Sequence, residues 1–225
     1  MTARELEVDA ISLAFGGLRV LDRVSIAVSS GELLALIGPN GAGKTTVFNC
    51  ISGICRPTGA SRFRGRDILG LRSHEVAGVG IARTFQHGEV FPRMTVTDNL
   101  MTARHRRIAT NPLAEMLGRP AVRRDEARHR AEVDRIIRLC ELERHRDTVV
   151  GNLPYGMQKL VGFARALAAG PALLLLDEPS AGLTPDERED LAHLILRTKE
   201  TLGIAMIWIE HDMQMVADLA DRIHV

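Results

Sequence analysis

The chain has 225 residues, of which 45% are hydrophobic and 25% are charged, and its formal net charge is +1. This composition is ordinary for a globular protein with a substantial core, and the small net charge favours neither a nucleic-acid-binding nor an acidic-surface protein. No apolar run approaches the roughly 18 residues of a membrane span, and the charged N-terminal residues argue against a signal peptide. Three cysteines, Cys50, Cys55 and Cys140, favour packing roles in a reducing compartment, so we expect a cytosolic protein.

Short apolar stretches separated by turn residues occupy the first 30 positions. Residues 6–8 and 24–28 predict antiparallel strands, and Phe15-Gly16-Gly17 marks a turn between them. The continuous apolar run at residues 33–37 then predicts a buried strand.

A glycine-rich loop follows this strand, with the sequence Gly38-Pro39-Asn40-Gly41-Ala42-Gly43-Lys44-Thr45-Thr46. Its first eight residues match the pattern G-x-x-x-x-G-K-[ST], and residues 47–51 have the apolar spacing of a helix, which Gly53 ends. In this setting backbone N–H groups can surround phosphate oxygens. Lys44 would neutralise the β- and γ-phosphates, and the Thr45 hydroxyl would bind Mg²⁺. The sequence therefore predicts a nucleotide-binding protein.

The next part of the chain changes character. We expect a turn at residues 56–59, a short strand ending at Gly65 and another strand at residues 78–86. From His87 to about residue 153 strand signals vanish, and residues 121–142 predict a long charged helix. We interpret this part as a helical subdomain inserted into an α/β core.

The arginines of the subdomain could form a binding surface or an ordinary solvated helix face. Eight arginines cluster there: Arg104, Arg106, Arg107, Arg119, Arg123, Arg124, Arg128 and Arg130. They could form a nucleic-acid or lipid-headgroup surface. However, acidic residues are interleaved and aromatic stacking residues are absent, so a solvated helix face is favoured. Five histidines without metal-ligand spacing are interpreted as surface residues: His74, His87, His105, His129 and His145.

Helices and buried strands alternate after residue 156. A helix begins at Met157 and ends at Gly170-Pro171, and the four leucines at residues 173–176 predict a strand covered on both faces. Thr184-Pro185-Asp186-Glu187 has the cap, proline and acidic residue of a helix start.

That helix runs to Gly203. Residues 204–209 predict the next buried strand, and a further helix begins near Met213. Residues 223–225 begin an extended segment, so we expect the natural chain to continue beyond Val225.

Two carboxylates, Asp177 and Glu178, directly follow the four-leucine strand. They are therefore expected at the carboxyl edge of a parallel sheet, where such sheets bind ligands. Phosphoryl transfer to water requires a carboxylate that holds Mg²⁺ and a group that orients or deprotonates the water. Asp177 suits the first role and Glu178 the second. Gln86 and His211 also close predicted strands and could meet the Mg²⁺, the water or the γ-phosphate.

The order of these motifs resembles the ATP-binding cassette of ABC transporters over essentially the whole chain. The resemblance implies an α/β P-loop NTPase cassette with a mostly parallel sheet core, N-terminal antiparallel strands and an inserted helical subdomain. Residues 1–86 and 159–225 would form the core, and residues 87–158 the helical subdomain with the signature motif.

The resemblance also implies roles for individual residues. Phe15 would stack on the adenine of ATP, and Gln86 would contact Mg²⁺ and the membrane subunit. Lys44, Glu178 and the switch histidine His211 would be catalytic, and Thr45, Gln86 and Asp177 would lie at the metal. The signature motif would comprise Leu153, Pro154, Tyr155, Gly156, Met157 and Gln158. The D-loop would comprise Ser180, Ala181, Gly182, Leu183 and Thr184.

In this family the helix that starts near Gly156 faces the γ-phosphate held by a second cassette, so that two ATP molecules lie between two head-to-tail cassettes. The implied partners are therefore a second identical or related cassette, transmembrane permease subunits and, indirectly, an extracellular or periplasmic solute-binding protein, with no nucleic acid. The implied location is peripheral, on the cytoplasmic face of the cell membrane. Two positions depart from the family pattern, because Pro154 replaces the usual serine and Thr184 the usual aspartate. We expect ATP hydrolysis to survive both.

Segments between the motifs narrow the resemblance to the first ATP-binding subunit of bacterial branched-chain (hydrophobic) amino acid importers. These segments are Phe15 to Leu18, Ala82 to Gln86, Phe91 to Val96 and Ala181 to Pro185. Related cassettes serve importers of urea or short amides, or lipopolysaccharide export, and these remain alternatives. A non-transport ABC ATPase of DNA repair or ribosomes and a small-molecule P-loop kinase are the less favoured classes.

Overall fold

The computed structural model describes residues 4–84, 90–105 and 120–225. The chain forms two compact units, one made of residues 1–86 and 172–225 and the other of residues 87–171. Within the described ranges, each helix is too short or too polar to cross a membrane.

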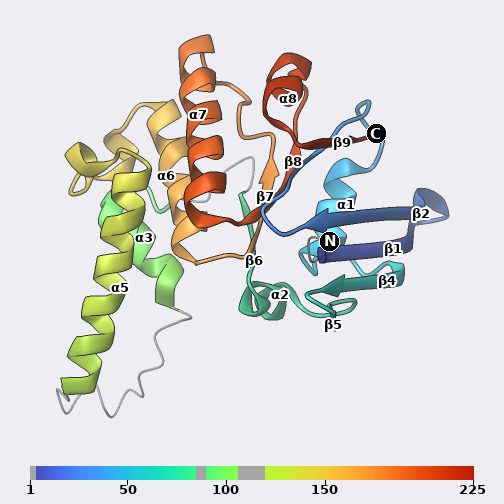
Figure 1. Cartoon of the computed structure of the whole chain (residues 1–225), viewed down its shortest axis with the longest axis horizontal. Helices are drawn as coiled ribbons and strands as arrows, with labels where there is room; N and C mark the ends of the chain where they lie inside the picture. The colour runs from blue at the N-terminus through green and yellow to red at the C-terminus, as the bar shows by residue number, and fades with distance from the viewer. Residues whose placement is uncertain (1–3, 85–89, 106–119) are drawn as a thin grey trace. The chain divides into compact units, whose positions relative to one another are not determined.

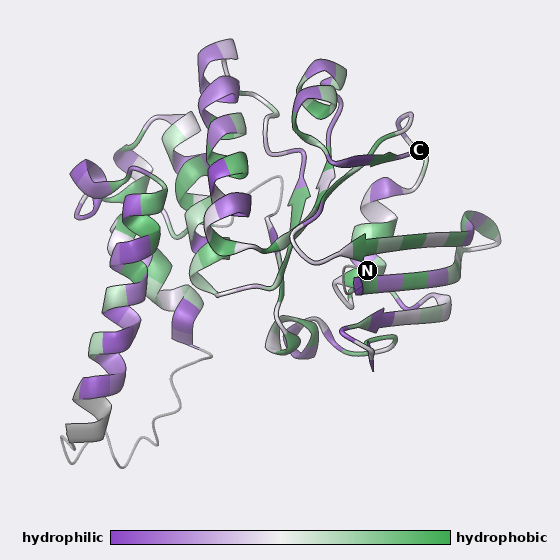
Figure 2. Cartoon of the chain, in the orientation of Figure 1, coloured by the Kyte–Doolittle hydropathy of each residue, from purple (hydrophilic) through white to green (hydrophobic). Residues whose placement is uncertain are grey.

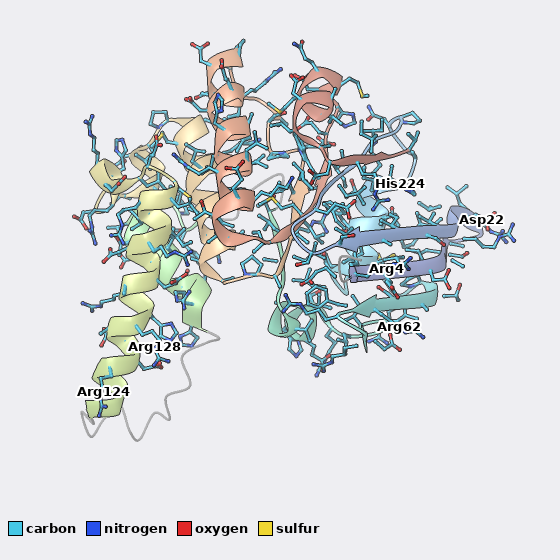
Figure 3. The ribbon with its side chains drawn as sticks, viewed as in Figure 1. Arg4, Asp22, Arg62, Arg124, Arg128 and His224 are labelled. Carbon is cyan, nitrogen blue, oxygen red and sulfur yellow. The ribbon has the colours of Figure 1, made fainter. Side chains whose placement is uncertain are left out.

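The first unit contains an antiparallel sheet with the strand order β2-β1-β4-β5. Its strands are β1 (Arg4–Phe15), β2 (Leu18–Ser29), β4 (Thr58–Phe63) and β5 (Arg66–Asp67). Strands β1 and β2 pair directly across Gly16-Gly17, which confirms the predicted hairpin (Figure 1). Charged side chains such as Arg4, Asp22 and Arg62 project from this sheet into solvent (Figure 3).

The first unit also contains a parallel sheet with the order β6-β7-β8-β3-β9. Its strands are β3 (Leu33–Leu36), β6 (Ile81–Thr84), β7 (Leu173–Asp177), β8 (Ala205–Ile209) and β9 (Arg222–His224). Strands β3, β7 and β8 are buried at every residue, as expected for the continuous apolar runs of a sheet covered on both faces. Figure 2 shows that β7 is hydrophobic. The carboxyl ends of these three neighbouring strands therefore lie at one edge of the sheet.

The described residues of this unit form four helices: α1 (Lys44–Ile51), α2 (Ser73–Val79), α7 (Pro185–Leu202) and α8 (Met213–Leu219). One hydrophobic cluster joins Leu6 of β1, Phe48 of α1 and Ile207 of β8, and so fixes α1 beside both sheets. The predicted cap of α7 is confirmed, because the Thr184 hydroxyl accepts from the Glu187 N–H and the Glu187 carboxylate accepts from the Thr184 N–H.

The predicted strand at residues 78–86 is wrong at its start. Residues 78 and 79 belong to α2, and β6 begins at Ile81. The physical reason is Gly80, whose φ of 107° lies in the left-handed region that ends helices.

The second unit is helical, as expected from its sequence. Its described helices are α3 (Val96–Arg104), α5 (Pro120–Leu139) and α6 (Tyr155–Ala168), with short 3₁₀ turns at Glu143–His145 and Val150–Asn152. The apolar face predicted for the long helix is confirmed, since Val133, Ile136 and Ile137 are buried. The other side of α5 is polar (Figure 2). The compact unit includes all of α6, whereas the sequence assignment divides that helix at residue 158.

Two residues predicted to lie at the surface of this unit are buried. The Arg104 Nε donates to His129 Nδ1 over 3.0 Å, and the Arg104 Nη1 donates to the Ala168 carbonyl oxygen over 2.9 Å. Arg104 is 6% exposed and His129 3% exposed. The surface interpretation is therefore wrong for both residues, because a hydrogen bond to the C-terminal end of α6 satisfies the buried guanidinium.

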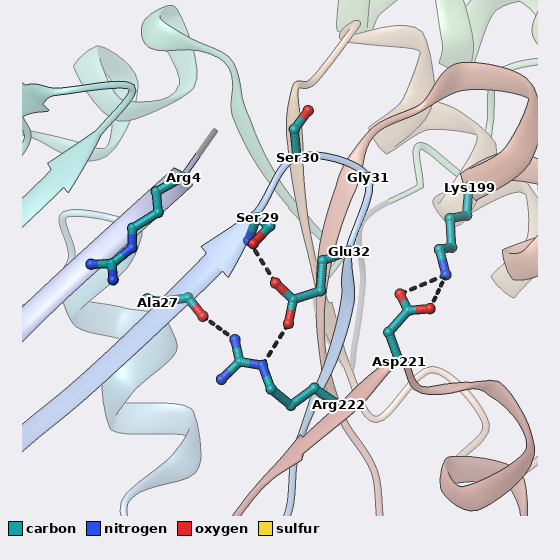
Figure 4. Close-up of a pocket in the computed structure, with 9 residues that line it drawn as sticks. All are labelled: Arg4, Ala27, Ser29, Ser30, Gly31, Glu32, Lys199, Asp221 and Arg222. Carbon is teal, nitrogen blue, oxygen red and sulfur yellow. Dashed lines mark hydrogen bonds and ion pairs between the residues drawn. The ribbon is translucent and has the colours of Figure 1, made fainter. Parts of the chain in front are cut away.

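Ion pairs hold β9 in place around a polar hollow of about 610 Å³ in the first unit (Figure 4). Arg222 Nε donates to Glu32 over 2.7 Å, and Lys199 Nζ donates to Asp221 over 2.6 Å. Burial tends to raise the pKa of Glu32, but the hydrogen bonds from Arg222 and the Ser29 N–H outweigh it, so this pKa lies below its ordinary value. The ion pairs in this hollow join neighbouring segments of the fold, so we assign the hollow a structural role.

Candidate functional site

The glycine-rich loop turns through backbone conformations that favour glycine. The φ angles of Gly38, Gly41 and Gly43 are 149°, 84° and 93°. A Cβ atom on Gly43 would lie 2.8 Å from the Leu21 Cδ2 atom and 3.1 Å from the Val20 carbonyl oxygen. Position 43 therefore requires glycine for two reasons: its φ is positive, and a side chain would be too close to Leu21 and Val20. Gly43 is the N-cap residue of α1.

The start of α1 offers backbone N–H groups to an anion. The helical hydrogen bond nearest the start runs from the Val47 N–H to the Gly43 carbonyl oxygen over 2.9 Å. The N–H groups of Lys44, Thr45 and Thr46 precede it, and such groups lack acceptors inside a helix. No acidic residue occupies the first turn of α1, which the structure describes in full. These features favour phosphate oxygens at this helix end.

Lys44 lies across the glycine-rich loop. Its Nζ donates to the Gly38 carbonyl oxygen over 2.7 Å and to the Pro39 carbonyl oxygen over 3.0 Å, and the residue is 9% exposed. Both acceptors are neutral, whereas a phosphate oxygen forms a stronger, charge-assisted hydrogen bond. The ammonium is thus held beside the helix start where it can bind a phosphate.

A cavity of about 260 Å³ joins this loop to the carboxyl edge of the parallel sheet. It is lined by Val20, by residues of the loop and the start of α1, and by Glu178. Glu178 is far from the loop in the sequence, but β7 and β3 both flank β8, so their carboxyl ends are close. The structure therefore places the carboxylate predicted to act on water in the same cavity as the predicted phosphate-binding residues.

Glu178 and His211 form a pair. The His211 Nε2 lies 2.9 Å from Glu178 Oε1, and with an ionised carboxylate the imidazole N–H is the donor. Glu178 has a φ of 46°, which is unfavourable for a residue with a side chain, and its N–H donates to the Ile209 carbonyl oxygen over 3.0 Å. The sequence placed both residues at strand ends, but their direct contact emerges only from the neighbouring positions of β7 and β8.

Asp177 is buried and forms an ion pair with the Arg83 side chain. Its Oδ2 accepts from Arg83 Nη2 over 2.6 Å, and Arg83 Nη1 donates to Asn49 Oδ1 over 2.7 Å. The Arg83 guanidinium carbon also lies 5.5 Å from the centre of the Phe48 ring. Sequence reasoning missed Arg83 as a contact of Asp177, because only the pairing of β6 with β7 reveals it.

The remaining predicted residues of this unit lie on nearby segments. Phe15 ends β1 with 53% of its surface exposed. Ser180, the first D-loop residue, is 4% exposed and donates to Glu210 over 2.8 Å, whereas Thr184 ends the loop as the cap of α7. Gln86 lies outside the residues that the structure describes.

The predicted signature segment forms the start of α6 in the second unit. Pro154 is the N-cap residue and makes no side-chain cap bond, while its carbonyl oxygen accepts from the Gln158 N–H over 3.0 Å. The Gln158 side chain donates to the Leu153 carbonyl oxygen over 2.8 Å, and Gly156 is buried. The N–H groups of the first turn, from Tyr155 onward, therefore have no partner in the helical pattern.

The donor set for a metal ion consists of oxygen atoms. Among the described residues, no three His, Cys, Asp or Glu side chains gather as a metal site. The Thr45 hydroxyl and the Asp177 carboxylate are the kind of oxygen donors that suit Mg²⁺ when a nucleotide supplies further ligands.

Burial and the nearby Cys55 raise the pKa of the Cys50 thiol to about 12, which fits a neutral packing residue.

Residues 21–181 match the family model of the ABC transporter. The chain is 40% identical to the high-affinity branched-chain amino acid transport ATP-binding protein BraF of Pseudomonas aeruginosa, over 98% of this chain and 87% of that protein. It is 38% identical to the corresponding protein LivG of Escherichia coli K12, with the same coverage.

A solved structure supports the same assignment. The ADP conformation of MJ1267, an ATP-binding cassette of an ABC transporter, has a TM-score of 0.85 and 32% identity, over 100% of this chain and 87% of that one. The expected fold class is thereby confirmed, and cassettes of this family bind nucleotide. The chain belongs to the ABC transporter family, as an ATP-binding cassette.

Proposed function

We propose that this ABC ATPase powers the import of branched-chain amino acids across the cytoplasmic membrane. The observation that carries the ATPase site is the cavity in which Glu178 meets the glycine-rich loop. The solute rests on the similarity to BraF and LivG, since the residues of a cassette do not contact the transported molecule.

In this proposal the triphosphate of ATP lies against the start of α1. The N–H groups of the loop and of the first helical turn donate to phosphate oxygens, and Lys44 exchanges its two carbonyl partners for the β- and γ-phosphates. Phe15, exposed at the end of β1, offers its ring to the adenine.

Thr45, Asp177 and Gln86 would hold Mg²⁺, which when bound supplies neutralisation of the charge on the β- and γ-phosphates. Glu178 orients the attacking water and accepts its proton, and His211 donates a hydrogen bond to Glu178 and faces the transferred phosphoryl group.

The second cassette of the dimer would be contacted through the start of α6. A phosphate held by that partner would accept from the backbone N–H groups of the first turn of α6, which do not depend on a hydroxyl at position 154. We propose that the dimer binds permease subunits at the cytoplasmic face of the membrane and serves, through them, an extracellular or periplasmic solute-binding protein.

The experiment is an uptake measurement in source cells that carry Lys44→Ala in the native gene. Labelled leucine and labelled urea are compared, with a solute of an ABC-independent transporter as the control. Loss of leucine uptake alone supports the proposal. Loss of urea uptake alone would assign the cassette to a urea importer, and unchanged uptake of both would contradict the proposed solute.

A further inference from the structure

Glu210 is a buried carboxylate that the hydrolysis mechanism above does not use. It is 4% exposed and lies directly between Ile209, the last residue of β8, and His211. In the described part of the chain it makes no ion pair, and its two oxygen atoms are instead satisfied by hydrogen-bond donors. Burial of a carboxylate without a cation is costly unless such donors are well placed.

Three donors converge on this carboxylate. The Ser180 hydroxyl donates to Oε2 over 2.8 Å, and the Trp208 indole N–H donates to the same atom over 3.3 Å. The backbone N–H of His211 donates to Oε1 over 2.9 Å. The two oxygen atoms therefore face different segments: one holds the loop after β7, and the other holds the loop after β8.

The contacts of Glu210 involve residues next to Glu178 and His211, the proposed catalytic pair. Ser180 lies two residues after Glu178, and the His211 side chain contacts Glu178 over 2.9 Å. The Glu178 N–H also donates to the Ile209 carbonyl oxygen, directly before Glu210. A displacement of Ser180 would thus reach the backbone of His211 through a single carboxylate.

We propose that Glu210 is a positioning residue that couples the D-loop to the switch histidine, so that Glu178 and His211 adopt their catalytic arrangement only when Ser180 is in place. This inference rests on the roles proposed above for His211 and for the D-loop. It assigns to Glu210 an effect on the rate of hydrolysis, with no contact to ATP.

The test is the variant Glu210→Gln. An amide has a single acceptor oxygen: with that oxygen on the His211 N–H, its NH2 group faces the Ser180 hydroxyl and the Trp208 N–H, so the Ser180 contact must reverse its direction and the indole loses its acceptor. We expect kcat for ATP hydrolysis to fall about tenfold, while the Kd for a fluorescent ATP analogue stays within about twofold. Ser180→Ala should lower kcat similarly, and the double variant should fall no further than the lower single variant, because both changes break one linkage.

The chain contains a built-in reporter of this linkage, because Trp208 is its one tryptophan and is fully buried. Tryptophan emission should therefore shift in Glu210→Gln and in Ser180→Ala. In the wild type, nucleotide binding should also shift the tryptophan emission. This shift on nucleotide binding should be lost in both variants. If Glu210→Gln lowers the melting temperature, Ser180→Ala, which removes one oxygen atom, carries the same test.

Two matched controls separate the proposal from a general effect of burial. Glu5 is 5% exposed and paired with Arg64 on the antiparallel sheet, so Glu5→Gln removes a buried charge outside the site. The buried Ser61 hydroxyl has no hydrogen-bond partner among the described residues, so Ser61→Ala matches Ser180→Ala. Both controls should keep the wild-type kcat.

Multiplicative losses of kcat in the double variant, or a wild-type kcat in Glu210→Gln, would overturn the proposal. Failure of the proposed hydrolysis site itself is a separate result, since it would be seen as ATP hydrolysis that survives Lys44→Ala.

Discussion

Two helix starts carry the motifs of this chain, and they are built in different ways. At the start of α1 the N-cap residue Gly43 has a φ of 93°, and a side chain there would contact β2. At the start of α6 the N-cap residue Pro154 has an ordinary extended conformation, with φ −54° and ψ 154°, and no side-chain bond. The first start therefore constrains the identity of its N-cap residue, whereas the second makes no use of its N-cap side chain.

If residues 153–158 are the signature motif, as expected from the sequence, this difference accounts for a proline at position 154 beside an unchanged glycine-loop pattern. Proline is tolerated at a helix start because its missing N–H has no helical acceptor there. We therefore expect substitutions at the first helix start to have large effects and the Pro154 substitution to have a small one.

The largest effect is expected for Lys44→Ala. Loss of the ammonium that lies across the loop should lower kcat/KM for ATP by about 100-fold or more, because a charged donor to the phosphates is removed. Lys199→Ala, which breaks the remote ion pair with Asp221, is the matched control and should retain the wild-type ATPase rate. Equal rates in the two variants would contradict the assignment of the first helix start to phosphate binding.

A smaller effect is expected for Gly43→Ala. The added methyl group would meet Leu21 and Val20, so the loop must shift, and nucleotide affinity should fall about tenfold with a stability loss of about 1–3 kcal/mol. Gly65→Ala is the control, since Gly65 also has a positive φ but an added Cβ there has no atom within 4 Å. Gly65→Ala should reduce stability by about 1 kcal/mol and leave affinity unchanged, as isothermal calorimetry and thermal unfolding can show.

The smallest effect is expected for Pro154→Ser, which restores the usual family residue. A serine N-cap should raise stability by about 0.5–1 kcal/mol, through a hydrogen bond to an N–H of the first turn of α6. The ATPase rate should change less than about threefold, because the helix amides are already present. A wild type without ATPase activity that gains it through Pro154→Ser would contradict this expectation.

Much of the fold could be predicted from local pattern. The apolar runs of β3, β7 and β8 identified buried parallel strands, and the cap of α7 was visible in four residues. In each case neighbouring residues in the sequence carry the physical cause. The predicted strand before Gln86 began too early, because only the left-handed conformation of Gly80 separates it from α2.

The contacts of the site could not be predicted in the same way. The bond from Arg83 to Asp177 requires that β6 lie next to β7, and the bond from Ser180 to Glu210 requires that β7 lie next to β8. Neither arrangement follows from periodicity along the chain. The burial of His129 was missed for a related reason, because its partner Arg104 comes from another helix.

The variant Glu178→Gln tests most directly whether the cavity shared by the glycine-rich loop and Glu178 is the site of ATP hydrolysis. Purified Glu178→Gln is mixed with radiolabelled ATP and Mg²⁺, and the bound nucleotide is identified by chromatography. We predict ATP affinity within about threefold of the wild type, hydrolysis about 100-fold slower, and bound label recovered as ATP. Hydrolysis at the wild-type rate, or a loss of ATP binding, would contradict this assignment.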